Sequence, residues 1–180
     1  MELHRPALVW ALVVFMALGV GVATAEEPDV PRLEESLRLL PPLDFCGEPV
    51  PLDDPDVRER MEKELALSLW DRDQAILWLK RSTRYLPHIE SMLAEAGLPD
   101  DLKYMALAES ALRPHVGSPK GAIGFWQFLP ETGRRYGLTI NDSVDQRRNL
   151  AASTRAAIAY FAELHEKFGS WSLVAAAFNM

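Results

Sequence analysis

The chain has 180 residues, of which 48% are hydrophobic and 25% charged, with 13 prolines and one cysteine. This composition excludes a disordered chain, which would be less apolar, and a disulfide scaffold, which would contain many more cysteines. The 26 acidic residues outnumber the 19 basic ones, so the formal net charge is −7. A protein that neutralises phosphates needs the opposite balance, and nucleic acid is therefore not expected as a partner.

The first 25 residues have the layout of a secretory signal peptide. His4 and Arg5 supply positive charge, residues 7–22 are apolar, and Ala23-Thr24-Ala25 offers a small-residue cleavage site. Retention of this segment as a membrane anchor is the alternative, because residues 7–25 are just long enough to span a bilayer. We therefore expect an exported protein of the periplasm or cell envelope, associated with the membrane if the segment is retained.

Residues 26–53 are expected to form a Pro-rich linker. Six of the prolines lie in this stretch and leave room for one short helix over residues 34–40. Cys46 has no partner for an internal disulfide and is expected to be partly buried.

Beyond this linker, the pattern predicts helices separated by glycine and proline, with no sustained alternation of apolar and polar residues. The expected helices begin after Asp54, after Asp71, near Pro87, at Asp100-Asp101, after Asn149 and after Ser170. Gly97 and Gly169 are expected to end two of them, and a long loop is expected over residues 113–123. The sequence thus predicts an all-α protein with a helical region over residues 54–97 and a second domain over residues 98–180.

One carboxylate lies on an apolar helix face. Leu102, Met105, Glu109 and Leu112 fall within about 80° of one another on a helical projection. Burial disfavours the ionised form of a carboxyl group and raises its pKa. A carboxyl group that stays protonated near neutral pH can act as the general acid that protonates a glycosidic oxygen. Alternatively, Glu109 is the last polar residue of its helix or pairs with Arg113.

Three ordered motifs resemble those of the lytic transglycosylases with a lysozyme-like, goose-type catalytic domain, most of all the membrane-bound murein-degrading members. They are Ala108-Glu109-Ser110, the Gly-Ala-Ile-Gly-Phe-Trp-Gln-Phe-Leu-Pro run over residues 121–130, and Ala177-Phe178-Asn179. The resemblance covers residues 98–180. It implies an all-α lysozyme-like fold that acts on the glycan strands of peptidoglycan.

The resemblance also implies roles for individual residues. Glu109 would be the single catalytic acid/base, and Ser110 would position the sugar or the acid. Gln127 would bind the substrate or hold the cleft, and Asn179 would contact sugar near the scissile bond. Phe178 belongs to the same substrate-binding set but replaces the family's usual tyrosine, so a hydrogen bond from that hydroxyl is lost.

The remaining motif residues form the loop beside the cleft. Gly121 and Gly124 would let the loop approach the glycan closely, since neither has a side chain. Phe125 and Trp126 could be a platform for sugar rings or members of the core, and core packing is favoured.

The implied reaction uses Glu109 first as acid and then as base, and closes a 1,6-anhydro ring on N-acetylmuramic acid. Most glycosidases use a second carboxylate, but the spare acids are expected in capping or solvated positions. These acids are Glu131, Asp142, Asp145 and Glu163. The alternatives are a hydrolytic muramidase of the same fold, a non-catalytic glycan-binding scaffold, and a helical interaction protein.

No metal or cofactor is expected. His88, His115 and His165 lack the spacing of a helical metal pair, and no phosphate-binding loop is present. The Arg134-Arg135 and Arg147-Arg148 pairs are expected on solvated helix faces, although they could also meet carboxylates of murein.

The apolar helical segment over residues 171–180 ends without a cap or a breaker. The glycine expected two residues after Asn179, and a tyrosine expected further on, are not in the sequence. We therefore expect a C-terminally incomplete catalytic domain that is weakly active or inactive by itself.

Overall fold

The computed structural model describes residues 39–179. The expected signal peptide or anchor lies outside these residues, as does most of the helix expected over residues 34–40. Leu39 and Leu40, at the end of that helix, are not helical. Within the described residues, no helix is both long enough and apolar enough to cross a membrane.

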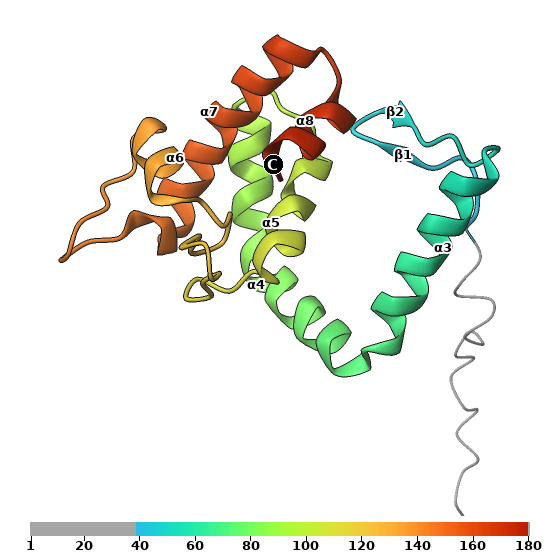
Figure 1. The fold of residues 1–180 in the computed structure, drawn as a ribbon, viewed down its shortest axis with the longest axis horizontal. Helices are drawn as coiled ribbons and strands as arrows, with labels where there is room; N and C mark the ends of the chain where they lie inside the picture. The colour runs from blue at the N-terminus through green and yellow to red at the C-terminus, as the bar shows by residue number, and fades with distance from the viewer. Residues whose placement is uncertain (1–38, 180) are drawn as a thin grey trace, which may run out of the picture. The chain divides into compact units, whose positions relative to one another are not determined.

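The described part of the chain is almost entirely helical, as expected (Figure 1). Its strands are β1 (Asp44–Phe45) and β2 (Glu48–Pro49), and its 3-10 turns are η1 (Asp100–Leu102) and η2 (Gln146–Arg148). Its α-helices are α3 (Pro55–Trp70), α4 (Arg72–Glu95), α5 (Lys103–Ser110), α6 (Pro130–Arg135), α7 (Leu150–Phe168) and α8 (Trp171–Phe178).

Side-chain caps define the starts of four helices at the residues that the sequence indicated. Asp54, Asp71, Asn149 and Ser170 each accept a backbone hydrogen bond from the first turn of α3, α4, α7 and α8. Such caps satisfy amide groups that have no partner inside the helix. Gly169 ends α7 with a positive φ of 65°, a conformation that glycine adopts without steric cost.

The prediction of two helices between Asp71 and Gly97 is wrong, because α4 is continuous through Pro87. An interior proline removes one backbone hydrogen bond and crowds the preceding turn. Here the residues around it are fixed by tertiary contacts, since Leu86, Ile89 and Leu93 are buried in the core. Burial of this face outweighs the local preference for a break.

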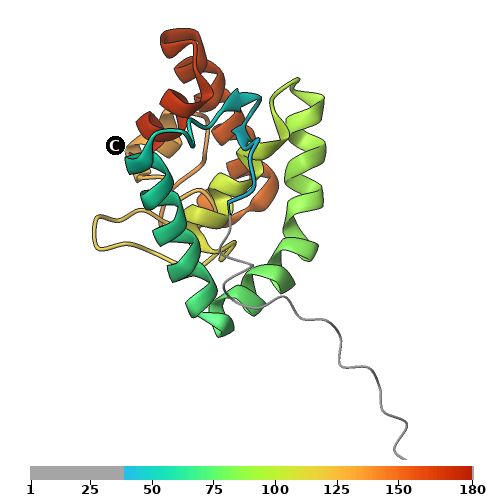
Figure 2. The ribbon, with the colours of Figure 1, turned by 90° about the vertical axis from the view of Figure 1, so that its right-hand side faces the viewer.

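The core lies where α4, α5, α7 and α8 meet. Figures 1 and 2 show α7 alongside both α4 and α8, with α5 packed on α4. The largest fully buried apolar side chains come from α4, α7 and α8, from η1 and from the loop that follows α5: Trp126, Phe161, Ile89, Leu93, Leu102, Leu112 and Val174. This cluster holds the C-terminal ends of α5 and α8 close to the same loop.

A small antiparallel hairpin, β1–β2, lies in the stretch that the sequence indicated as linker. Its Glu48 carboxylate binds the first turn of α8, accepting hydrogen bonds from the Ser172 amide at 3.0 Å and from the hydroxyls of Ser170 and Ser172 at 2.9 and 2.7 Å. The Trp171 amide is a further donor. A carboxylate is favoured at a helix N-terminus, where backbone N–H groups and the helix dipole both attract negative charge.

Cys46, at the turn of this hairpin, is partly buried, which confirms that prediction. Its amide donates to the Asp101 carboxylate at 2.7 Å, and burial raises the pKa of its thiol to about 12. The hairpin is therefore attached both to η1 and to α8.

We expect Glu48→Gln to lower the melting temperature at neutral pH. The hydrogen bonds from Ser172 and Trp171 lower the pKa of Glu48 from 4.5 to about 2. A carboxyl whose pKa is lower in the folded state stabilises the fold above its unfolded pKa, and this contribution is lost as the pH falls toward the folded value. The difference between variant and wild type should therefore shrink from about pH 4.5 toward pH 2 in thermal melts. Glu64→Gln, at an exposed position of α3, is the control; equal effects of both changes would contradict the prediction.

Candidate active site

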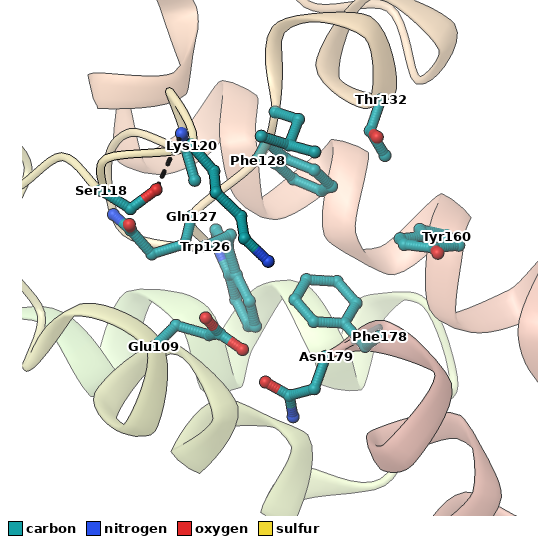
Figure 3. Close-up of a pocket in the computed structure, with 12 residues that line it drawn as sticks. Glu109, Ser118, Lys120, Trp126, Gln127, Phe128, Thr132, Tyr160, Phe178 and Asn179 are labelled. Carbon is teal, nitrogen blue, oxygen red and sulfur yellow. Dashed lines mark hydrogen bonds between the residues drawn. The ribbon is translucent and has the colours of Figure 1, made fainter.

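A cleft of about 500 Å³ opens between the C-terminal ends of α5 and α8 and the loop that follows α5 (Figure 3). Glu109 lies on the α5 side, Phe178 and Asn179 on the α8 side, and Tyr160 comes from α7. The loop over residues 118–129, together with Thr132 of α6, forms the rest of the wall. Segments far apart in the sequence thus converge on one acidic side chain.

Glu109 projects into this cleft from the last turn of α5 (Figure 3). The helix ends directly after Ser110, where Ala111 and then Leu112 have positive φ values of 52° and 56°. Leu102, Met105 and Leu112 are buried, as predicted, but of these only Met105 lies on α5: Leu102 belongs to η1 and Leu112 follows the end of α5. Glu109 is half-buried and therefore lies where this apolar face meets the cleft.

Burial raises the pKa of the Glu109 carboxyl above its usual 4.5. Among residues 39–179, no group donates a hydrogen bond to the carboxylate that would offset this desolvation. A carboxyl in such surroundings keeps its proton to a higher pH than an exposed one, which suits a general acid.

Of the described residues that line the cleft, Glu109 is the only one with a carboxyl group. Asp145 instead caps η2 and pairs with Arg147 at 2.7 Å. Glu163 pairs with Arg135 and accepts a hydrogen bond from the Tyr136 hydroxyl. The capping and solvated positions expected for these two acids are confirmed.

Ser110 does not line the cleft. Its side chain is buried, with the hydroxyl 2.8 Å from the carbonyl oxygen of Phe125 and 3.1 Å from that of Ala106. Because a hydroxyl has a single proton, it donates to one carbonyl at a time. The bond to Phe125 connects α5, and hence the base of Glu109, to the loop on the other side of the cleft.

Gln127 both lines the cleft and holds the loop together. Its side-chain amide nitrogen donates to the carbonyl oxygens of Val116 at 3.1 Å and Gly124 at 2.9 Å. Its φ of 48° is unusual for a residue with a side chain, and such backbone strain persists only where surrounding contacts enforce it.

Neither Gly121 nor Gly124 of the loop lines the cleft. A Cβ atom on Gly124, where φ is 87°, would lie 2.0 Å from the backbone oxygen of Arg147. Gly121 also has a positive φ, 84°, but a Cβ there would meet no atom within 4 Å. Gly124 therefore permits close packing of the loop on η2, whereas Gly121 permits a turn.

Arg147 corrects the prediction that the arginine pairs are solvated. Its side chain is buried, at 4% exposure for the residue, and pairs with Asp145. It also donates to the carbonyl oxygens of Gly121 at 2.8 Å and Phe128 at 3.0 Å. A buried charge is costly unless paired and hydrogen-bonded, and these partners satisfy it. Because two of the partners are backbone carbonyls, the sequence pattern gives no signal for them.

The other three arginines of these pairs are largely exposed and none lines the cleft. Arg134 donates to the carbonyl oxygen of Ile140, Arg135 pairs with Glu163, and Arg148 lies 3.4 Å from His115. Their positions therefore do not support the suggestion that the arginine pairs meet carboxylates of a ligand in this cleft.

The aromatic pair Phe125-Trp126 is core, as favoured from the sequence. Both side chains are at most 2% exposed, and the Trp126 indole N–H donates to the Thr154 hydroxyl at 3.0 Å. Phe178 packs on this core with its ring centroid 5.1 Å from that of Phe161 and 5.3 Å from that of Tyr160. It also lines the cleft, so an apolar ring forms part of the wall facing Glu109 (Figure 3).

Asn179 follows α8 directly and is exposed at the cleft. Its side-chain nitrogen donates to the carbonyl oxygen of Ala175 at 3.1 Å. This bond fixes the direction of the amide group, whose oxygen lies toward Glu109 in Figure 3.

Several residues of the cleft were missed at the level of sequence. Ser118 and Lys120 of the loop line it, as does Thr132 of the short helix α6, and none of these segments has apolar periodicity that could indicate a site. Tyr160 of α7 packs on Phe178 and also lines the cleft, which the pattern of α7 alone does not indicate. Across the described residues, His, Cys, Asp and Glu side chains form no group of three or more that could hold a metal ion.

Comparisons with known proteins agree with the motifs. Residues 87–180 match the family described as the transglycosylase SLT domain. Over 170 residues, 91% of this chain, the sequence is 31% identical to the membrane-bound lytic murein transglycosylase D of Escherichia coli (strain K12). The protein of the same name from Escherichia coli O6:H1 gives the same identity and coverage. The match covers 37% of the length of each of these relatives, so the chain spans well under half of them.

We expect Gly124→Ala to destabilise the fold by more than about 3 kcal/mol, because the new methyl group would overlap the backbone of Arg147. Gly121→Ala is the matched control: it introduces the same methyl group at a similar positive φ but into open space, at a cost of about 1–2 kcal/mol. Chemical denaturation of both variants measures the difference. Equal losses of stability in the two variants would contradict the prediction that residue 124 must be glycine because the loop packs closely on η2.

Proposed function

Because the chain belongs to the transglycosylase SLT domain family, we propose that it is a lytic transglycosylase that cleaves peptidoglycan glycan strands. The bond cleaved is the β-1,4 bond between N-acetylmuramic acid and N-acetylglucosamine. The observation on which this proposal depends is the cleft, in which Glu109 is half-buried, has a raised pKa and is the only carboxyl group among the described lining residues.

In the first step, protonated Glu109 donates its proton to the glycosidic oxygen as the bond from C1 of N-acetylmuramic acid to that oxygen breaks. The N-acetylglucosamine part leaves as an alcohol. The oxygen of the 2-acetamido group of N-acetylmuramic acid stabilises C1 as positive charge develops there. This step requires Glu109 to be protonated when the bond breaks, and its raised pKa supports this.

In the second step, the Glu109 carboxylate accepts the proton of the C6 hydroxyl of the same sugar while that oxygen bonds to C1. The product is 1,6-anhydro-N-acetylmuramic acid, Glu109 regains its proton, and no water is consumed. An internal hydroxyl needs no second carboxylate to activate a water molecule, and the reaction gains from being intramolecular. The described lining of the cleft has a single carboxyl group, which fits these two steps better than it fits the mechanism of most glycosidases, in which two carboxylates take part.

The other residues of the motifs support Glu109. Ser110 acts as a positioning residue through its hydrogen bond to Phe125 rather than by touching sugar. Asn179 contacts the sugar near the scissile bond and Phe178 offers an apolar surface beside it; the position of both residues in the lining of the cleft supports these roles. Gln127 shapes the wall through its bonds to Val116 and Gly124.

We also propose that the protein acts in the cell envelope, where its substrate is found. The name of the related murein transglycosylase describes a membrane-bound protein. This agrees with the export segment expected over the first 25 residues. Whether that segment is cleaved or retained decides whether the enzyme itself is bound to the membrane.

We expect Glu109→Gln to lower the rate of murein cleavage by about 10²–10⁴-fold, because the amide cannot donate the proton. Mass spectrometry of the wild-type products should show muropeptides lighter than hydrolysis products by one water molecule. Glu131→Gln, which changes an acid in the first turn of nearby α6 that does not line the cleft, is the matched control and should keep full activity. Products of full hydrolysed mass would instead identify a muramidase. Binding of murein without any cleavage by the wild type would identify a scaffold.

We expect kcat/KM to fall as the pH rises through the pKa of Glu109. The acid must be protonated in the free enzyme, and burial raises that pKa above 4.5, so the alkaline limb of the profile should lie above that of an exposed carboxyl. Rates measured from about pH 4 to pH 9 test this. An alkaline limb centred at or below pH 4.5 would contradict the assignment of Glu109 as the acid.

A further inference from the structure

We propose that Lys120 binds a carboxylate of the lactyl-peptide side arm of muramic acid and so makes the cleft selective for an anionic glycan. This inference rests on the proposed function, because it concerns the sugar that would occupy the cleft beside Glu109. It adds a specificity-determining residue outside the three motifs, because the second motif begins at Gly121, directly after Lys120.

Lys120 is placed to meet a ligand. Figure 3 shows its side chain extending from the loop into the space between Glu109 and Phe178, with the ammonium group at the end. The residue is exposed, so the ammonium remains hydrated and mobile until a ligand arrives.

Lys120 brings a positive charge into the cleft that no acidic side chain of the described residues neutralises. Of the described residues that line the cleft, it is the only lysine or arginine, in a chain whose formal net charge is −7. Lys103, Arg135 and Arg147 pair with acidic side chains of the protein, whereas within residues 39–179 no carboxylate lies within ion-pair distance of Lys120. Its positive charge is therefore available to a ligand.

The position of Lys120 is compatible with the protonation that Glu109 needs. A cation close to a carboxyl group lowers its pKa. The pKa of Glu109 is nevertheless raised, with burial as its cause. Burial thus outweighs any effect of Lys120 on the pKa of Glu109, so that Lys120 can attract a substrate anion while the acid keeps its proton.

The proposed substrate has carboxylates on the sugar that would lie next to Glu109. Muramic acid differs from glucosamine by a lactyl group on the ring that would lie next to Glu109. On bare strands this group ends in a free carboxylate, and on peptide-bearing strands the peptide supplies carboxylates instead. A flexible lysine tolerates either position, because its ammonium is a point charge without the fixed geometry of arginine.

The test compares wild type, Lys120→Met, Lys120→Arg and the control Lys80→Met, which removes an exposed charge from α4. Three substrates are used: peptide-bearing murein strands, the same strands with the peptides removed by an amidase, and strands whose carboxyl groups have been converted to neutral amides. We expect Lys120→Met to raise KM on the two anionic substrates by about five-fold, the effect of one partly exposed ion pair, with kcat nearly unchanged. Lys120→Arg should retain most of the affinity, and Lys80→Met should match wild type.

The neutral strands decide the outcome. On them, wild type and Lys120→Met should have equal KM values; an equal loss on neutral and anionic strands would overturn the proposal. A loss on bare strands only would identify the lactyl carboxylate as the ligand, and a loss on peptide-bearing strands only would identify the peptide.

Binding measurements separate this proposal from the proposed reaction. Dissociation constants for the same three substrates are measured with Glu109→Gln and with the Glu109→Gln, Lys120→Met double variant. A five-fold weaker affinity of the double variant for anionic strands alone would support the role of Lys120 even if the wild type cut no substrate. Equal affinities would refute it even if the enzyme were active.

Discussion

The buried guanidinium of Arg147 is the interaction on which the shape of the cleft depends. It binds the carbonyl groups of Gly121, at the start of the run over residues 121–130, and of Phe128, near its end, while Asp145 balances its charge. The close approach of Gly124 to the Arg147 backbone fixes the same loop at a third point. Because a buried arginine tolerates few alternative arrangements without losing its partners, the loop has one well-defined path along the cleft.

That path places the loop where it completes the surroundings of Glu109. The Phe125 carbonyl receives the Ser110 hydroxyl, so the end of α5 and the loop are connected directly beneath the acid. On the opposite side, α8 is anchored at its start by Glu48 and at its end by the packing of Phe178 on Phe161 and Tyr160. A half-buried carboxyl results from three separately anchored segments, and its raised pKa is a consequence of the fold rather than of a charged neighbour.

The glycine-containing run illustrates the limit of reasoning from motifs. Glycines beside an expected sugar-binding cleft suggest close approach of the ligand, and Gly124 does mark a close approach, but to the backbone of η2. The arginine pairs show the same limit, since Arg147 and Arg148 are neighbours in sequence and only one is buried. Side chains that bind backbone carbonyls leave no pattern that spacing could reveal. The continuity of α4 through Pro87 depends likewise on burial of the residues around it.

The sequence by itself determined the all-α class, the capped starts of α3, α4, α7 and α8, and the position of Glu109 on the apolar face of α5. These features depend on local hydrogen bonds and on helical periodicity, which neighbouring residues encode. Only the tertiary structure decided that Arg147 is buried, that Ser110 faces the loop and that Lys120 and Tyr160 share a cleft with Glu109. Those relations join residues from different segments, and their geometry exists only once α5, α7, α8 and the loop have packed around a common core.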